Sequence, residues 1–152
     1  MSDVEIDQFV LLLTDFSAAT KKDDKIIKAE MICVLSEYSD IVYVQSKLPF
    51  PFSNRDVCQR RFILSNKKHP ELIESFGLPQ KKSTAYFIFN EAIALEECPT
   101  PKGFERAKMY TLTVVEEHPT KPGAIKVTNV GQNDPGGSIP DSIINKMATK
   151  MS

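Results

Sequence analysis

The sequence predicts an α+β fold, with a helix at each end and an antiparallel sheet between them. Apolar residues recur at helical spacing around Ile6 and around Ile143. The segments between are β-branched and aromatic, and turns rather than crossover helices connect them, an order that favours antiparallel pairing. With 152 residues, 41% hydrophobic and 26% charged, the chain has an ordinary globular composition. We therefore expect a single domain over residues 1–152.

The two helices are predicted from their first residues. Ser2 and Glu5 have the spacing of a capping box. The apolar face of this first helix then consists of Ile6, Phe9, Val10 and Leu13. The last helix is expected over 141–151, because Pro140 suits a first helical turn. Its apolar stripe consists of Ile143, Ile144, Met147 and Met151.

Strands are predicted at 41–44, 57–64, 84–95, 105–117 and 124–132. Residues 26–35 also resemble strand material, although their pattern is ambiguous. Residues 47–54 form a connector of prolines and aromatic residues, and 66–82 a surface excursion with a short helical piece at 70–76. The strand at 84–95 is apolar on both faces, with Phe87 and Phe89 on one of them, so it needs cover on both sides from a core or a ligand.

Composition excludes several classes of function. A net charge of −1 gives no general attraction to nucleic acid or to an anionic membrane. The three cysteines form no C-x-x-C pair and no signal peptide is evident, so we expect a cytoplasmic protein. The two histidines are isolated, so we expect no metal site. No apolar run reaches the roughly 20 residues that span a bilayer, and membrane contact is expected to be peripheral.

Catalytic patterns are also missing from the sequence. There is no G-x-S-x-G elbow, and the glycine pair Gly136-Gly137 lacks the lysine of a phosphate-binding loop. Acidic pairs such as Glu96-Glu97 flank turns, where solvated carboxylates are common. We therefore expect neither an enzyme nor a cofactor.

Two segments carry most of the information. In the first, Ser53-Asn54-Arg55-Asp56 turns the chain and its charged pair is expected to make structural hydrogen bonds. Arg61 follows inside a strand, on the face of Val57 and Gln59. If that face is interior, its guanidinium needs an anionic or polar partner, either a lipid headgroup or a buried carboxylate.

The second segment runs from Asn133 to Asn145. Its glycine pair permits a tight turn from strand to helix, and Pro140 fixes the first turn of that helix. Such a hinge is compatible with a helix that acts as a lid and equally with a helix that is simply packed.

Together these segments resemble a START (StAR-related lipid transfer) domain, most closely the phosphatidylcholine-transfer-protein branch. Residues 47–56 keep that branch's proline-aromatic-proline and Ser-Asn-Arg-Asp pattern, and Arg61 falls on its strand arginine. Residues 134–145 match the family's Asp-Pro-Gly-Gly hinge, and Phe104-Glu105-Arg106-Ala107 is similar to the opening of a family strand.

The resemblance implies a helix-grip fold, in which an antiparallel sheet curls around the C-terminal helix and encloses one lipid. It implies non-catalytic binding and transfer of a phospholipid or a sterol between membranes. The lipid-binding residues implied in this way are Arg61, Tyr43, Phe87, Phe89, Arg106, Ile143, Ile144 and Met147. The structural motif consists of Ser53, Asn54, Arg55, Asp56, Asp134, Gly136, Gly137 and Pro140.

The sequence departs from the family pattern in ways that affect these expectations. It starts at the helix that usually follows the first three strands, and its last helix is short, so a truncated domain is expected. We also expect the strand acid that partners the arginine in sterol carriers to be lacking, with Val42 near its place. Missing strands would expose a sheet edge, which favours a homodimer. The alternative function is a protein-interaction or regulatory module that has kept the fold and lost the lipid pocket.

Overall fold

The structure is a computed structural model that describes residues 3–15, 19–140 and 142–143. The chain begins with helices α1 (Asp3–Thr14) and α2 (Ala19–Lys22). Three strands follow: β1 (Ile26–Ser36), β2 (Ser39–Ser46) and β3 (Asn54–Ser65). The remaining elements are α3 (Pro70–Ser75), β4 (Ala85–Ala92), β5 (Phe104–Arg106), β6 (Lys108–Glu117) and β7 (Ile125–Asp134).

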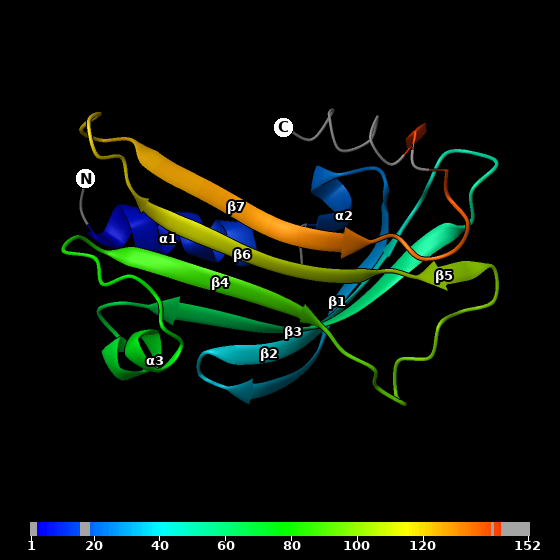
Figure 1. Cartoon of the computed structure of the whole chain (residues 1–152), viewed down its shortest axis with the longest axis horizontal. Helices are drawn as coiled ribbons and strands as arrows, with labels where there is room; N and C mark the ends of the chain where they lie inside the picture. Colours follow the sequence, from blue (N-terminus) through cyan, green and yellow to red (C-terminus); the bar gives the residue numbers. More distant parts are fainter. Residues whose placement is uncertain (1–2, 16–18, 141, 144–152) are drawn as a thin grey trace.

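These strands form one sheet in the order β1-β2-β3-β4-β6-β7, and every neighbouring pair on this path is antiparallel. Figure 1 shows the long strands β3, β4, β6 and β7 side by side, with α1 visible behind β6. The predicted antiparallel α+β architecture is therefore confirmed. The ambiguous segment at 26–35 is the edge strand β1.

The predicted strand at 105–117 is interrupted at Ala107. Its first residues form β5, which pairs in parallel with the start of β3, whereas β6 pairs with β4. The backbone N–H of Ala107 donates to the carbonyl of Asp56 at 2.9 Å, which holds the chain at the break. The predicted strand at 84–95 likewise ends at Ala92.

The expected excursion between β3 and β4 contains α3, with Pro70 in its first turn. The side chain of Asn66 closes its base by donating to the carbonyls of Lys81 and Ser83 at 3.0 and 2.8 Å. Of the predicted terminal helix, residues 142 and 143 are described, and the N–H of Ile143 donates to Pro140 at 2.9 Å. The rest of that helix lies outside the described residues, as does Ser2 of the predicted capping box.

Side-chain alternation divides the sheet into two faces, which we name after the helices that cover them. The α1 face carries Ile63, Tyr86, Ile88 and Val115, which pack against α1. The α3 face carries Leu64, Ala85 and Phe87, which pack against Ile73 of α3. A third cluster extends the α3 face into β2 and consists of Ile41, Tyr43, Cys58 and Cys98.

Candidate functional site

A hollow of about 250 Å³ lies on the α1 face, between the C-terminal end of α1 and four strands. One strand after another contributes a side chain to it, because residues two apart on a strand share a face. Its lining consists of Leu13, Thr14, Arg61, Ile88, Asn90, Thr113, Val127 and Asn129. The hollow is smaller than common ligand pockets of roughly 300–1,000 Å³, and Arg61 lines it.

Arg61 is the one charged residue in this lining, and it is only 5% exposed. It lies directly opposite Asp40 in the β2–β3 ladder. Its Nε and Nη2 donate to the two carboxylate oxygens of Asp40 at 2.9 and 2.6 Å, and its Nη1 donates to the carbonyl of Thr14 at 2.8 Å. The partner of Arg61 is thus the carboxylate of Asp40, whose side chain is 13% exposed, and this two-point contact fixes the plane of the guanidinium.

The structure corrects one expectation here. The strand acid that was expected to be lacking near Val42 is present two residues earlier, at Asp40. Both positions lie on the same face of β2, so alternation alone could not choose between them. The register of the β2–β3 hairpin decides which one meets Arg61.

Polar side chains continue the wall of the hollow, and sequence reasoning missed them. Asn129 donates to the hydroxyl of Thr113 at 3.2 Å, across the β6–β7 ladder. Asn90 donates to Thr111 at 3.0 Å, across the β4–β6 ladder. The signal that could have revealed them is Asn90, a polar residue two positions after Ile88 and therefore on the same face of β4.

Arg55 joins the two segments that the sequence singled out. Its guanidinium donates to the carbonyls of Ser53 at 2.6 Å and Gly136 at 3.0 Å, and also to that of Pro135. Arg55 lies on the same face of β3 as Arg61, so it ties the hinge to the α1 side of the sheet. These contacts are structural hydrogen bonds of the kind expected for Arg55.

The hinge needs its first glycine for two reasons. Gly136 has a φ of +65°, a backbone conformation that residues with a Cβ rarely adopt. A Cβ at this position would also lie 2.5 Å from the carbonyl oxygen of Arg106. Asp134 supports the turn, because its carboxylate accepts the N–H of Gly136 at 2.9 Å.

A second ion pair lies on the opposite face. Arg106 donates to both carboxylate oxygens of the fully buried Asp56, at 2.9 and 2.8 Å, and to the carbonyl of Cys98 at 2.6 Å. The hydroxyl of Tyr43 also donates to Asp56, at 3.0 Å. The hydrogen bonds that Arg106 donates to Asp56 raise the pKa of Arg106, and burial raises the pKa of Tyr43. This cluster anchors β5 and the loop before it to the sheet.

The structure does not bring the implied lipid-binding residues together. Arg61 faces the hollow, whereas Tyr43 and Arg106 belong to the Asp56 cluster on the other face. Phe87 is fully buried beneath α3, and the ring of Phe89 stacks on Phe76 with centroids 5.7 Å apart. Ile143 is half-buried beyond the hinge. Ile144 and Met147 lie outside the described residues.

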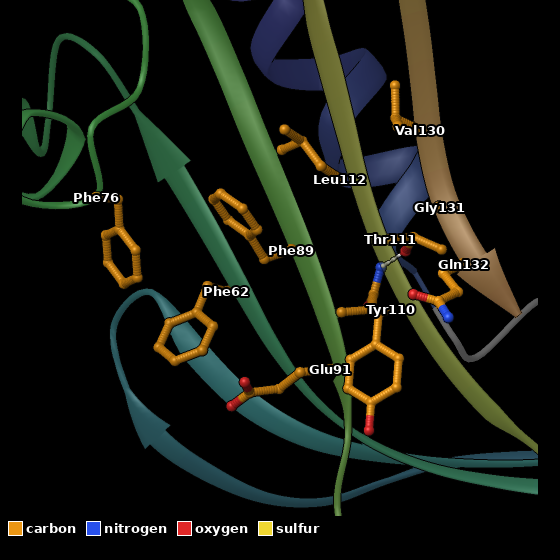
Figure 2. Close-up of a pocket in the computed structure, with 11 residues that line it drawn as sticks. Phe62, Phe76, Phe89, Glu91, Tyr110, Thr111, Leu112, Val130, Gly131 and Gln132 are labelled. Atoms are coloured by element: carbon orange, nitrogen blue, oxygen red, sulfur yellow. Dashed lines mark hydrogen bonds between the residues drawn. The ribbon is translucent and has the colours of Figure 1, made fainter.

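A separate apolar hollow of about 520 Å³ lies on the α3 face. Figure 2 looks onto it: Phe62, Phe76 and Phe89 stand on the near side of the strands and α1 lies on the far side. The hollow extends across β6 and β7, where Tyr110, Leu112 and Val130 line it. Its aromatic residues belong partly to the packing between α3 and the sheet.

Within the described ranges, no group of three or more histidine, cysteine, aspartate or glutamate side chains is placed to hold a metal ion. No helix in the same part of the chain is long and apolar enough to cross a membrane.

Comparisons with known proteins agree with this architecture. A family model of the START domain matches residues 12–151. START domain-containing protein 10 of mouse and that of human are each 26% identical to the chain over 145 residues. The match covers 95% of this chain and 44% of each relative, so the chain spans less than half the length of these relatives.

Solved structures show the same fold. The crystal structure of human STARD10 matches with a TM-score of 0.74 at 25% identity, covering 94% of this chain and 51% of that one. A fragment of a STAR-related lipid transfer protein from Xanthomonas axonopodis matches with a TM-score of 0.68 at 19% identity, covering 94% and 70%. These likenesses confirm the helix-grip fold. Because the family model matches most of its length, the chain belongs to the START family.

Proposed function

We propose that this chain binds a lipid on the α1 face of its sheet and carries it between membranes without chemical change. The observation that supports this most is the hollow beside the buried Arg61 and its ion-pair partner Asp40. Its wall combines aliphatic side chains from Leu13, Ile88 and Val127 with hydrogen-bonding groups, as a site for an amphipathic molecule requires. The proposed cargo is a phospholipid such as phosphatidylcholine, or a sterol.

Physical reasoning favours binding over catalysis for such a site. Each methylene of a lipid chain removed from water contributes roughly 0.8 kcal/mol. A pocket can therefore hold a lipid without any covalent step. The arginine fits a positioning role, because its ion pair keeps it fixed while a phosphate or hydroxyl approaches.

The connector at 47–53 is the proposed membrane contact. Phe50 at its tip is 97% exposed, and exposed aromatic side chains are favoured at membrane interfaces. The N–H of Phe52 donates to the carbonyl of Pro49 at 3.1 Å, which shapes the tip as a turn. Arg55 ties this connector to the hinge at 135–136, so the membrane contact lies next to the segment that leads to the last helix.

Lipid binding is tested by native mass spectrometry of protein purified from cells, followed by analysis of an organic extract. We expect a bound phospholipid or sterol on the wild type and on Arg60→Gln. We expect its loss from the folded Asp40→Asn/Arg61→Gln double variant. Arg60 is a matched control because it is the adjacent residue of β3, on the other face and exposed. An extract of the wild type that contains no lipid would overturn the proposal.

Membrane contact is tested with vesicles of phosphatidylcholine. Phe50→Ser should lower vesicle binding and the transfer of a fluorescent phospholipid, while bound lipid stays unchanged. Phe76→Ser is the control, because it removes a ring that is 48% exposed on the α3 face. Equal vesicle binding by the two variants would contradict the role given to the connector.

A second candidate function is the protein-interaction module, which the apolar hollow on the α3 face favours. It predicts that a protein partner, rather than a lipid, covers Phe76 and Tyr110 and so shields them from solvent. A lipid-free extract combined with such protection would decide for this second function.

A further inference from the structure

A smaller hollow, of about 240 Å³, lies on the α3 face where β4 ends and β6 begins, and we call it the β6 hollow. Small side chains leave space in its wall, those of Ala92, Ala94 and Ala107. Its polar lining consists of Arg106, Lys108 and Tyr110, and no acidic residue of the described ranges lines it. Common ligand pockets measure roughly 300–1,000 Å³, so the β6 hollow suits one polar group rather than a whole lipid.

The guanidinium of Arg106 is held so that one of its nitrogens is left for a ligand. Its Nε and Nη2 donate to the two carboxylate oxygens of Asp56, and Nη2 also donates to the carbonyl of Cys98. Its Nη1 has no hydrogen-bond partner among the residues that the structure describes. The two-point contact with Asp56 fixes the plane of the guanidinium. An anion that enters the hollow therefore meets an arginine whose orientation is already set.

Lys108 and Tyr110 add an ammonium and a hydroxyl to the same hollow. They are two residues apart on β6 and therefore share a face. Both side chains are exposed, and neither polar group has a partner within the described part of the chain. Asp56 offsets the charge of Arg106, so Lys108 supplies the net positive charge of the hollow.

The two acids that lie opposite these side chains have partners of their own. Glu91 lies opposite Tyr110 in the β4–β6 ladder, and its carboxylate accepts a hydrogen bond from Arg60 at 2.6 Å. Asp134 lies opposite Lys108 in the β6–β7 ladder, and its carboxylate accepts a backbone N–H of the hinge at 2.9 Å. Neither acid lines the hollow, so its positive charge is available to an anion.

The β6 hollow lies at the same end of the sheet as the connector at 47–53. That connector leads into β3, and the first residues of β3 pair with β5, whose last residue is Arg106. Figure 1 shows β5 and the turquoise loop before β3 at one end of the sheet. Phe50 in this connector is the proposed membrane contact. A membrane that receives Phe50 therefore faces the end of the sheet that carries the hollow.

We propose that the β6 hollow binds the phosphate monoester of an anionic membrane lipid. A phosphate monoester carries a charge of about −1.5 to −2 near pH 7 and has three strong acceptor oxygens. The donors of Arg106, Lys108 and Tyr110 match these oxygens in kind. A phosphate diester has fewer free oxygens and less charge, so it is held less tightly. The membrane source of the phosphate rests on the proposed membrane contact, whereas the phosphate site itself does not.

Vesicle flotation tests the membrane source. Phosphatidylcholine vesicles carry either phosphatidic acid, a phosphate monoester, or phosphatidylglycerol, a phosphate diester, at equal surface charge. The wild type should bind the vesicles with phosphatidic acid more tightly. Lys108→Gln/Tyr110→Phe should lower that affinity about tenfold, because it removes a charged hydrogen bond and a neutral one. Arg106 is left in place in this variant, so that the buried Asp56 keeps its partner.

Lys102→Gln is the matched control. It removes the same charge from the loop before β5, at an exposed position outside the hollow, and it should bind both kinds of vesicle as the wild type does. A wild type that binds the two anionic vesicles equally would overturn the membrane source. Equal losses of affinity in Lys102→Gln and Lys108→Gln/Tyr110→Phe would overturn it as well, because charge alone would then explain the binding.

Glycerol 3-phosphate tests the site without a membrane. At millimolar concentration it should shift the amide resonances of Lys108 and Tyr110 in the wild type and in Phe50→Ser, and not in Lys108→Gln/Tyr110→Phe. The absence of these shifts from the wild type would overturn the phosphate site. Shifts combined with equal binding to both kinds of vesicle would support the site and assign it to a soluble phosphate. A lipid-free extract with the shifts intact would refute the proposed lipid cargo and leave this site standing.

Discussion

Both faces of the sheet carry apolar side chains, but the α3 face forms a packed core and the α1 face borders a hollow. On β4, Phe87 is fully buried under α3, and its neighbour Ile88 lines the hollow on the α1 face. The α3 face is filled by aliphatic and aromatic side chains around Leu64 and Ile73. The α1 face carries an ion pair and hydrogen-bonded Asn–Thr pairs beside its apolar residues. A strand that is apolar on both faces thus serves a core on one face and a proposed ligand site on the other.

The Asp56–Arg106 and Asp40–Arg61 ion pairs differ in a similar way. Asp56 is surrounded by Arg106, Tyr43 and the backbone of β5, and its contacts join elements of the fold. Arg61 lines a hollow, and its partner Asp40 lies directly opposite it in the β2–β3 ladder. The Asp56 carboxylate is fully enclosed by protein groups, although Arg106 also lines a hollow of about 240 Å³. The Arg61–Asp40 pair instead lies beside the hollow of the proposed ligand site.

The largest effect on stability is expected on the α3 face. Phe87→Ala should lower the free energy of unfolding by up to about 5 kcal/mol, because it leaves a cavity in a closely packed core. Denaturant unfolding followed by circular dichroism measures this loss. The lipid content per folded molecule should not change, and a selective loss of lipid would place the binding site on the wrong face.

The next largest effect is expected from Arg61. Arg61→Met should destabilise the fold by about 3 kcal/mol, because it leaves the carboxylate of Asp40, whose side chain is only 13% exposed, without its arginine. Arg60→Met removes an arginine that is 44% exposed and should cost at most about 1 kcal/mol. Both are measured by denaturant unfolding, and equal losses would contradict the assignment of Arg61 to the interior.

A smaller effect is expected at the hinge. Gly136→Ala should cost about 1–3 kcal/mol, from the left-handed backbone and the contact with the carbonyl of Arg106. Gly123→Ala is the matched control, since its φ is +77° and no atom lies within 4 Å of the added Cβ. The difference between the melting temperatures of the two variants measures the effect of the contact with Arg106. Equal melting temperatures would show that the hinge does not pack against β5.

The smallest effect concerns pH. Burial raises the pKa of Cys58 from 9.0 to about 11, and burial also raises the pKa values of Tyr43 and Tyr86. A raised pKa means that the folded state holds the proton more tightly than the unfolded chain does. The resulting stability is fully present below pH 9 and is lost as pH rises toward 11. A pH series of melting temperatures measures the decline.

Thiol labelling gives the control for that prediction. Near pH 8, iodoacetamide should modify the exposed Cys33 and leave the buried Cys58 and Cys98 unmodified in the folded protein. Cys58→Ala should make the alkaline decline in stability shallower. Equal labelling of the three thiols would show that the third core cluster is open to solvent.

Much of the fold could be predicted because local signals were strong. The turn residues around Ser53 and the proline at the start of α3 marked the boundaries of β3 and α3. The break at Ala107 could not be predicted, because it depends on β5 pairing with a strand some fifty positions earlier, as the register of Glu105 with Arg55 shows.

The site was only partly predictable. Alternation placed Arg61 on the face of Val57 and Gln59, but it could not tell whether that face is interior or which face of β4 belongs with that arginine. The pairing of Arg61 with Asn90 in the β3–β4 ladder decides this, and it puts Ile88 rather than Phe89 beside the hollow. Register between strands is a tertiary property, so a list of apolar residues along one strand cannot supply it.

The most direct test of the central claim is photo-crosslinking with a phosphatidylcholine that carries a diazirine on one acyl chain. After irradiation and digestion, tandem mass spectrometry identifies the modified residues. The lipid site on the α1 face predicts modification at Ile88, Thr113 or Val127, and its loss in the Asp40→Asn/Arg61→Gln variant. Modification confined to Phe62, Phe89 or Leu112 would place the lipid on the α3 face and contradict the account.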